Sequence, residues 1–171
     1  MRKLLITITL LTFCVITEAK KYPFDMKHQY RVEQIRVAED GGRLIKAWGV
    51  ASNADKAIIQ ALQDAVACCI FMGLEAQNST TIGHNANALP SLCPEGLKAY
   101  DEHKAYFDQF FTKGDFLLYA ANSNTGYPTG ENNVKTKDGR QVGIYVVLKV
   151  DQLRKRLEQD GIIKSFETIW E

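Results

Sequence analysis

The chain has 171 residues, 21 of them basic and 20 acidic, so its formal net charge is only +1. Without a basic surplus there is no electrostatic support for binding the phosphates of a nucleic acid, and we expect no such partner. The length suits one domain with an adequate hydrophobic core.

Residues 1–19 have the order of a secretory signal peptide. Arg2 and Lys3 precede an apolar run, and Ala19 ends a sequence that resembles a small-residue cleavage site. The run is shorter than the roughly 20 residues that cross a bilayer, so we expect no transmembrane segment in the mature chain. We therefore predict an exported protein, periplasmic or extracellular, that is cleaved after Ala19.

Lipidation at Cys14 is the alternative, which the bulky Phe13 before it disfavours. Cleavage after residue 19 removes two basic side chains and one acidic one, which leaves a mature chain with a formal net charge of zero. Residues 20–171 are expected to form a single α+β domain.

The mature chain begins with an irregular arm at residues 20–28, followed by a predicted β-hairpin. In residues 29–38 the apolar side chains alternate apart from one slip between Val32 and Ile35, which predicts a β-bulge. Asp40-Gly41-Gly42 indicates a turn, and residues 44–51 return as the second strand. Within that strand, Gly49 predicts a close approach of the backbone to another element.

Residues 52–73 predict the central helix of the domain. Ser52 and Asp55 resemble a capping box, and Gly73 stands where a helix ends in a residue that tolerates positive φ. Several alanines share one line of this helix, which favours close packing on a sheet. They are Ala54, Ala61 and Ala65. The apolar arc is wider than the usual stripe of about 100°, so we expect the helix to be covered on more than one side.

Residues 74–96 show no periodicity and carry Cys93, whereas Cys68 and Cys69 lie in the central helix. In an oxidising compartment one pair of thiols can close. We predict a Cys68–Cys93 disulfide, because Cys69 lies nearer the middle of the apolar arc. The alternative is that all three are small buried hydrophobic residues with inert thiols.

Residues 97–113 predict a second helix with a wide aromatic face. Tyr100, Phe107 and Phe111 fall on one line, with His103 beside them. One interpretation is packing into the core, which is the usual role of aromatic residues at helical spacing. The other is an exposed surface for a ligand or partner, to which Trp170 of the apolar tail would add.

The rest of the chain predicts a strand at residues 115–121, a Gly- and Asn-rich connection with a hairpin arm at 134–137, and a strand at 141–150. Asp151 is expected to cap a last helix, which ends at Gly161. The order β-β-α-α-β-β-α predicts a two-layer α+β domain: an antiparallel sheet of about four strands with helices packed on one face.

Two motifs carry a resemblance to a known group of proteins. Trp48-Gly49-Val50-Ala51 runs into the alanine-rich helix, and Val146-Val147-Leu148-Lys149-Val150 leads to Leu153 and Leu157. This pattern resembles small exported bacterial envelope proteins, among them the N-terminal domain of the flagellar T-ring assembly protein and small outer-membrane lipoproteins. The resemblance implies a periplasmic module that binds other envelope components, and it assigns no functional residues.

No catalytic, cofactor-binding or metal-binding motif is found. Cys93 and His84 in the long loop are the residues that a hydrolase would use. With Cys68 and Cys69 they also have the ligand types of a zinc site, but adjacent helical cysteines point about 100° apart. We therefore expect an exported, non-enzymatic binding or structural module whose partner is another envelope protein. The alternatives are that hydrolase, or a carrier of an apolar ligand on residues 97–113.

Overall fold

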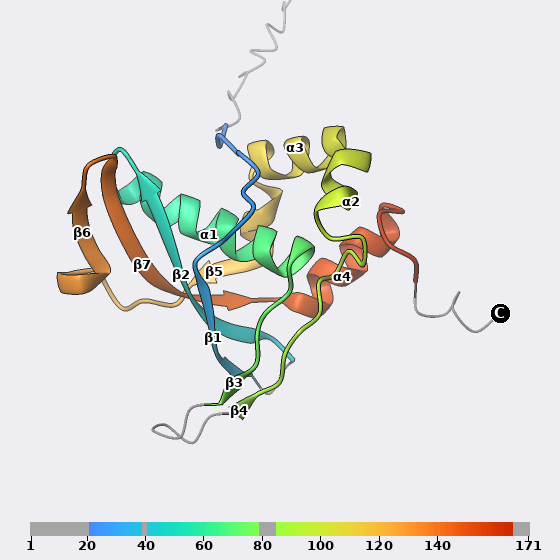
Figure 1. Ribbon diagram of the computed structural model, residues 1–171, viewed down its shortest axis with the longest axis horizontal. Helices are drawn as coiled ribbons and strands as arrows, with labels where there is room; N and C mark the ends of the chain where they lie inside the picture. Colours follow the sequence, from blue (N-terminus) through green and yellow to red (C-terminus); the bar gives the residue numbers. More distant parts are fainter. Residues whose placement is uncertain (1–20, 39–40, 79–84, 166–171) are drawn as a thin grey trace, which may run out of the picture.

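The computed structural model describes residues 21–38, 41–78 and 85–165, which form an α+β fold as predicted (Figure 1). Residues 1–19 with Cys14, and also His84 and Trp170, lie outside the described residues. The sheet is open, antiparallel and five-stranded, where about four strands were expected. Its order is β1 (Val32–Val37), β2 (Arg43–Ala51), β7 (Gly139–Leu148) and β5 (Ala120–Asn122), with β6 (Asn133–Thr136) also paired to β7.

The first hairpin follows its sequence pattern. β1 and β2 pair antiparallel, and their register shifts between Gln34 and Arg36, where the alternation slips. The predicted bulge is therefore confirmed. After β1, Gly41 has a φ of +79° and the amide of Ala38 donates a hydrogen bond to the carbonyl of Gly42, which closes the turn.

α1 (Ala54–Phe71) lies against the sheet and is buried along most of its length. It starts after Asn53, whose side chain accepts a hydrogen bond from the amide of Lys56, so the predicted cap at Ser52 is wrong by one residue. Either side chain can cap a helix, and the backbone geometry selects the asparagine. The end of α1 is as predicted, since Gly73 follows it with a φ of +80°.

Small residues set the distance between α1 and β2. A Cβ atom at Gly49 would lie 2.1 Å from the carbonyl oxygen of Ala57 and 2.5 Å from the amide nitrogen of Ala61. Both alanines are fully buried. Because backbone atoms of a helix cannot move aside alone, only glycine permits this approach, and the predicted close contact at Gly49 is confirmed.

The predicted helix at residues 97–113 is in fact two helices, α2 (Leu97–Glu102) and α3 (Lys104–Lys113), because the backbone leaves helical geometry at His103. In a straight helix, Tyr100 and Phe107 would lie about 10 Å apart along the axis. The break lets both rings reach Phe71 of α1, with centroid distances of 6.0 and 4.8 Å. No helix in the described part of the chain is both long and apolar enough to cross a lipid bilayer.

The predicted strand at residues 115–121 is wrong over its first half. Gly114 ends α3 with a φ of +89°, and the chain continues as a 3-10 helix, η1 (Asp115–Leu118), before the short β5. This turn buries Phe116 and leaves Leu118 exposed. A short apolar run is ambiguous between strand and helix, and here packing of Phe116 decides it.

Residues 74–96 were expected to be irregular, and they contain a small second sheet of β3 (Gln77–Asn78) and β4 (Asn85–Ala86). The chain then returns to α1, where the amides of Leu92 and Cys93 donate to the carbonyls of Cys69 and Ile70. Carbonyls in the last turn of a helix lack partners within it. Backbone hydrogen bonds therefore tether this segment to α1.

In the C-terminal part the predicted hairpin arm and strand are confirmed as β6 and β7, and the last helix matches its prediction only at its end. A 3-10 turn, η2 (Gly130–Asn132), precedes the β6–β7 hairpin. α4 (Val150–Gln159) starts without a side-chain cap, so the predicted cap at Asp151 is wrong. Its end is the predicted Schellman motif, in which Gly161 has a φ of +70° and the amide of Ile162 donates to the carbonyl of Leu157 over 2.8 Å.

Candidate functional site

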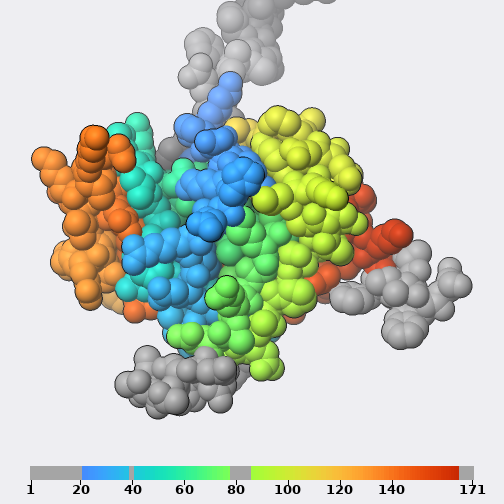
Figure 2. All heavy atoms as spheres, viewed as in Figure 1, coloured from blue at the N-terminus to red at the C-terminus, as the bar shows by residue number. Residues whose placement is uncertain are grey.

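An N-terminal arm, residues 21–31, crosses α1 and leads into β1 (Figure 1, Figure 2). It has no regular secondary structure but is held by the core. The amide of Tyr22 donates to the carbonyl of Thr112 over 2.9 Å, and the ring of Phe24 stacks on Phe111 with a centroid distance of 3.8 Å. Together with α2, α3 and η1, the arm belongs to the layer that covers α1 beyond its sheet-facing side, as the wide apolar arc of α1 predicts.

A partly buried ion pair attaches the arm to α1. The ammonium of Lys27 lies 2.5 Å from the carboxylate of Asp64, which also accepts a hydrogen bond from the Gln60 amide over 2.8 Å. Burial raises the pKa of Asp64, and the Lys27 ammonium opposes that rise. Since an unpaired charge is costly in such a place, the pair fixes where the arm lies.

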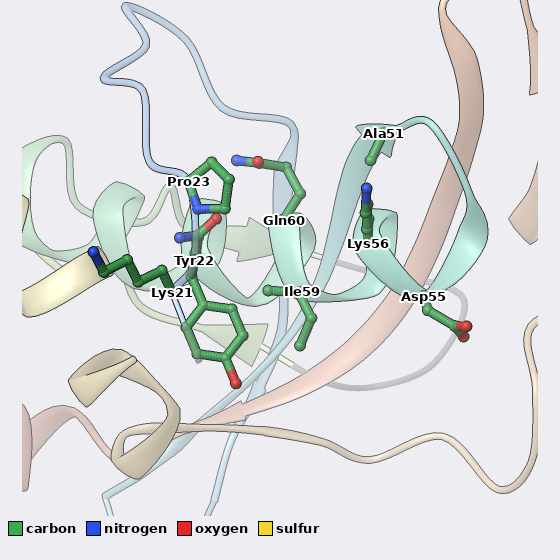
Figure 3. Close-up of a pocket in the computed structure, with 9 residues that line it drawn as sticks. Lys21, Tyr22, Pro23, Ala51, Asp55, Lys56, Ile59 and Gln60 are labelled. Atoms are coloured by element: carbon green, nitrogen blue, oxygen red, sulfur yellow. The ribbon is translucent and has the colours of Figure 1, made fainter. Parts of the chain in front are cut away.

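A cavity of about 340 Å³ lies between the start of the arm and the first half of α1 (Figure 3). Its walls are mainly apolar, and its charged groups do not converge: in Figure 3 the Asp55 carboxylate points away from the other labelled side chains. That carboxylate accepts a hydrogen bond from the Tyr127 hydroxyl over 3.2 Å. The residues that line the cavity are Lys21, Tyr22, Pro23, Ala51, Asp55, Lys56, Ile59, Gln60 and Gln63.

One lining residue of this cavity is unusual. Gln63 is 1% exposed, and its Nε2 atom has no hydrogen-bond partner among the described residues. The other two buried polar side chains of the described core, Gln34 and Asp64, are both hydrogen-bonded. The residues that line the cavity include no pair of groups arranged for acid–base or nucleophilic chemistry.

The aromatic surface predicted on residues 97–113 is part of the core. Phe107 and Phe111 are fully buried, and Tyr100 is 8% exposed. His103 is half-buried at the break between α2 and α3. The interpretation of these rings as core packing is confirmed. The prediction that Tyr100, Phe107 and Phe111 form an exposed ligand surface is wrong.

The three thiols in the described part of the chain, Cys68, Cys69 and Cys93, are buried and free, so the predicted Cys68–Cys93 disulfide is not formed in this structure. Burial raises the pKa of each thiol to about 12. The Cys68 thiol donates instead to the carbonyl of Gly73 over 3.2 Å. Cys93 is fully buried, so in this structure its thiol is out of reach of a substrate.

Metal binding has no support in the described residues, which contain no cluster of three His, Cys, Asp or Glu side chains able to hold an ion. Cys68, Cys69 and Cys93 do not form such a group with one another there. The fourth ligand that the sequence suggested, His84, lies outside the described residues.

A second candidate surface is the side of the sheet away from α1, here called the open face. Register places side chains on it in rows across the strands: Leu44 with Val147, Lys46 with Tyr145, Trp48 with Gly143, and Val50 with Gln141 and Val134. Val50 is 47% exposed and Tyr145 39%. Sequence reasoning missed this face, although the alternation in residues 44–51 marks it.

Cations lie over the rings of the open face. The Arg31 guanidinium is 4.2 Å from the centre of the Trp48 ring, and the Lys46 ammonium is 4.9 Å from Trp48 and 5.8 Å from Tyr145. A Cβ at Gly143 would lie 2.7 Å from the indole nitrogen of Trp48, so the glycine lets the indole lie flat on the sheet. Each such contact contributes about 0.5–1 kcal/mol at exposed sites.

No known protein family matches this chain, and neither a curated protein nor a solved structure is found to match it. The resemblance to the flagellar T-ring domain and the small outer-membrane lipoproteins therefore stays a prediction. The open face and the cavity beneath the arm are the two features of the described residues that bear on function.

Proposed function

We propose that the chain is an exported, non-enzymatic module that binds another protein of the cell envelope through the open face of its sheet. The observation that carries this proposal is the exposure of Val50, Tyr145 and Val134 around the cation-covered Trp48. Contiguous apolar surface with a charged rim is typical of protein-binding sites. The leader-like residues 1–19 support export.

Charge narrows the class of partner. Beside the apolar rows, the open face carries three basic side chains, Arg31, Arg36 and Lys46. The acidic side chain that β1 contributes to this face is Glu33. The cations of such a face attract acidic groups and align them. The partner segment is therefore expected to combine apolar side chains with Asp or Glu.

Site-specific crosslinking tests the surface. A photo-crosslinking amino acid replaces Tyr145 in the full chain, and the matched control places it at Met72, which is 36% exposed at the end of α1. We expect a discrete crosslinked species from position 145 alone, with an acidic crosslinked peptide by mass spectrometry. Lys46→Glu should abolish it while leaving the circular dichroism spectrum and melting temperature nearly unchanged.

Two results would contradict the proposal. One is equal crosslinking from positions 145 and 72, which would indicate random collision. The other is a product from position 145 that persists in Lys46→Glu. Export is measured separately by the intact mass of the chain from the envelope fraction, which should begin at Lys20, and a chain that keeps Met1 in the cytosol contradicts export.

A further inference from the structure

We propose that the cavity between the N-terminal arm and α1 binds a small carboxylate with a short apolar chain, and that the Gln63 amide donates the hydrogen bond that recognises the carboxylate. This site is separate from the open face, since none of the residues that line the cavity belongs to the rows of the open face. It does not depend on the proposed protein partner.

The starting observation is the unpartnered Nε2 atom of Gln63. A buried donor that lacks a partner costs about 1–3 kcal/mol, so a methionine or leucine would make a more stable ligand-free protein at this position. In contrast, the neighbouring Gln60 amide is used by Asp64. A ligand oxygen would supply the partner that the protein itself does not.

The Nε2 atom is shielded in the ligand-free structure, but the side chain borders the cavity. The terminal torsion of a glutamine has a broad energy minimum, so the amide can turn toward the cavity at little cost. A complementary acceptor in the cavity would then be hydrogen-bonded to a side chain that is itself buried, where such bonds are stronger than in bulk water.

The lining indicates what else the ligand carries. Tyr22, Pro23 and Ile59 offer apolar contacts for a short chain, and Lys56 adds a positive charge at the rim. The Asp55 carboxylate is hydrogen-bonded by Tyr127 and points away from the other labelled side chains, so it need not contact an anion bound between them. The volume of about 340 Å³ lies within the range of small-molecule sites, about 300–1,000 Å³.

The test uses sodium octanoate as the probe, titrated into the full chain and followed by calorimetry and by NMR shifts of Lys56, Ile59 and Gln63. We expect saturable binding with shifts confined to the cavity. 1-Octanol has the same chain without the carboxylate, and it should bind at least tenfold more weakly. N-acetyl-leucine presents the carboxylate of a peptide C-terminus, so comparing its affinity with that of octanoate separates a fatty-acid source from a peptide source.

Gln63→Met removes the donor and keeps the length of the side chain. We expect octanoate affinity to fall about tenfold or more, while the ligand-free variant is as stable as the parent chain or more stable. The matched control is Gln141→Met on the open face, which should bind octanoate normally. Gln63→Glu, with a negative charge at the same place, should abolish binding.

The proposal is overturned if octanoate causes no shifts at these residues at millimolar concentration. It is also overturned if octanol binds as well as octanoate, since the cavity would then be merely apolar. A Gln63→Met chain that loses stability and binds octanoate unchanged would assign the glutamine a structural role alone.

Discussion

The two faces of the sheet are formed by the same strands and meet different surroundings. On the inner face, Ile45, Ala47 and Val146 are fully buried against α1. On the open face, the neighbouring residues in the same strands include Lys46, which is half-buried, and the exposed Tyr145. In β2 and β7, a shift of one residue separates a position that fixes the fold from one that faces outward.

This difference teaches which side chains the fold explains. On the inner face, close packing against α1 determines which residues fit, as at Gly49, where no side chain fits against Ala57. On the open face, the main contacts are between cations and aromatic rings, and such contacts stabilise a folded domain only weakly. Packing accounts for the first face and leaves the second available for binding.

The largest effect is expected for Phe107→Ala in the helical layer on the inner side. Phe107 is fully buried, and its ring lies 4.8 Å from that of Phe71 and 5.2 Å from that of Tyr106. Truncation leaves a cavity, so the free energy of unfolding should fall by about 3–5 kcal/mol in urea denaturation. A loss below about 1 kcal/mol would mean that this ring is not core.

The same substitution, glycine to alanine, can be made on each face of the sheet: Gly49→Ala on the inner face and Gly143→Ala on the open face. The two losses of stability can then be compared. The new Cβ at Gly49 would lie 2.1 Å from a helix carbonyl, whereas at Gly143 it meets the Trp48 side chain at 2.7 Å. A side chain on the open face can shift and a helix backbone cannot. We expect losses of about 3 kcal/mol and about 1 kcal/mol, respectively, in the same denaturation assay. Equal losses would remove the contrast.

Much of the fold could be predicted from local sequence signals. The bulge in β1, the end of α1 at Gly73 and the Schellman motif at Gly161 each depend on residues close in sequence. The break at His103 and the 3-10 turn at Phe116 were missed because they depend on rings that meet across the core. Tertiary packing overrode helical and strand propensity at both places.

The candidate sites were less predictable than the fold. The arm has no periodicity, so nothing in its sequence indicates that Lys27 reaches Asp64, 37 residues away, or that a cavity forms beneath it. The wide apolar arc of α1 predicted a second cover but not which segment supplies it. The open face was within reach, because alternation in β2 assigns Lys46, Trp48 and Val50 to one side.

Lys27→Met tests the attachment of the arm through its ion pair with Asp64. It removes the partner of Asp64 and leaves a buried carboxylate, so at pH 8 we expect a loss of about 2–3 kcal/mol, reduced from a fully buried case because Lys27 is partly exposed. Without the ammonium, the pKa of Asp64 rises further above its unfolded value.

The pH dependence gives this prediction its direction. A carboxyl whose pKa is raised in the folded state takes up its proton as the pH falls through that pKa, and the folded state then gains stability relative to the unfolded state. The deficit of Lys27→Met should therefore shrink between pH 8 and pH 5 in urea denaturation. The control is the double variant Lys27→Met with Asp64→Asn compared with Asp64→Asn alone, and the difference in stability between these two should not change with pH. A constant deficit in the single variant would show that only packing was lost.

The smallest loss of stability is expected for Val50→Thr on the open face. The variant for comparison is Val142→Thr on the inner face. Val142 pairs with Gly49 of β2 and is fully buried, whereas Val50 is nearly half exposed. Threonine keeps the shape and the strand propensity of valine, so the hydroxyl is the main change. Burying it unpaired at 142 should cost about 1–3 kcal/mol, and at 50 the change should stay within about 0.5 kcal/mol. Equal losses of stability from Val50→Thr and Val142→Thr would contradict this prediction. They would mean that the open face is covered in solution by a partner or a second copy, and is not a free binding surface.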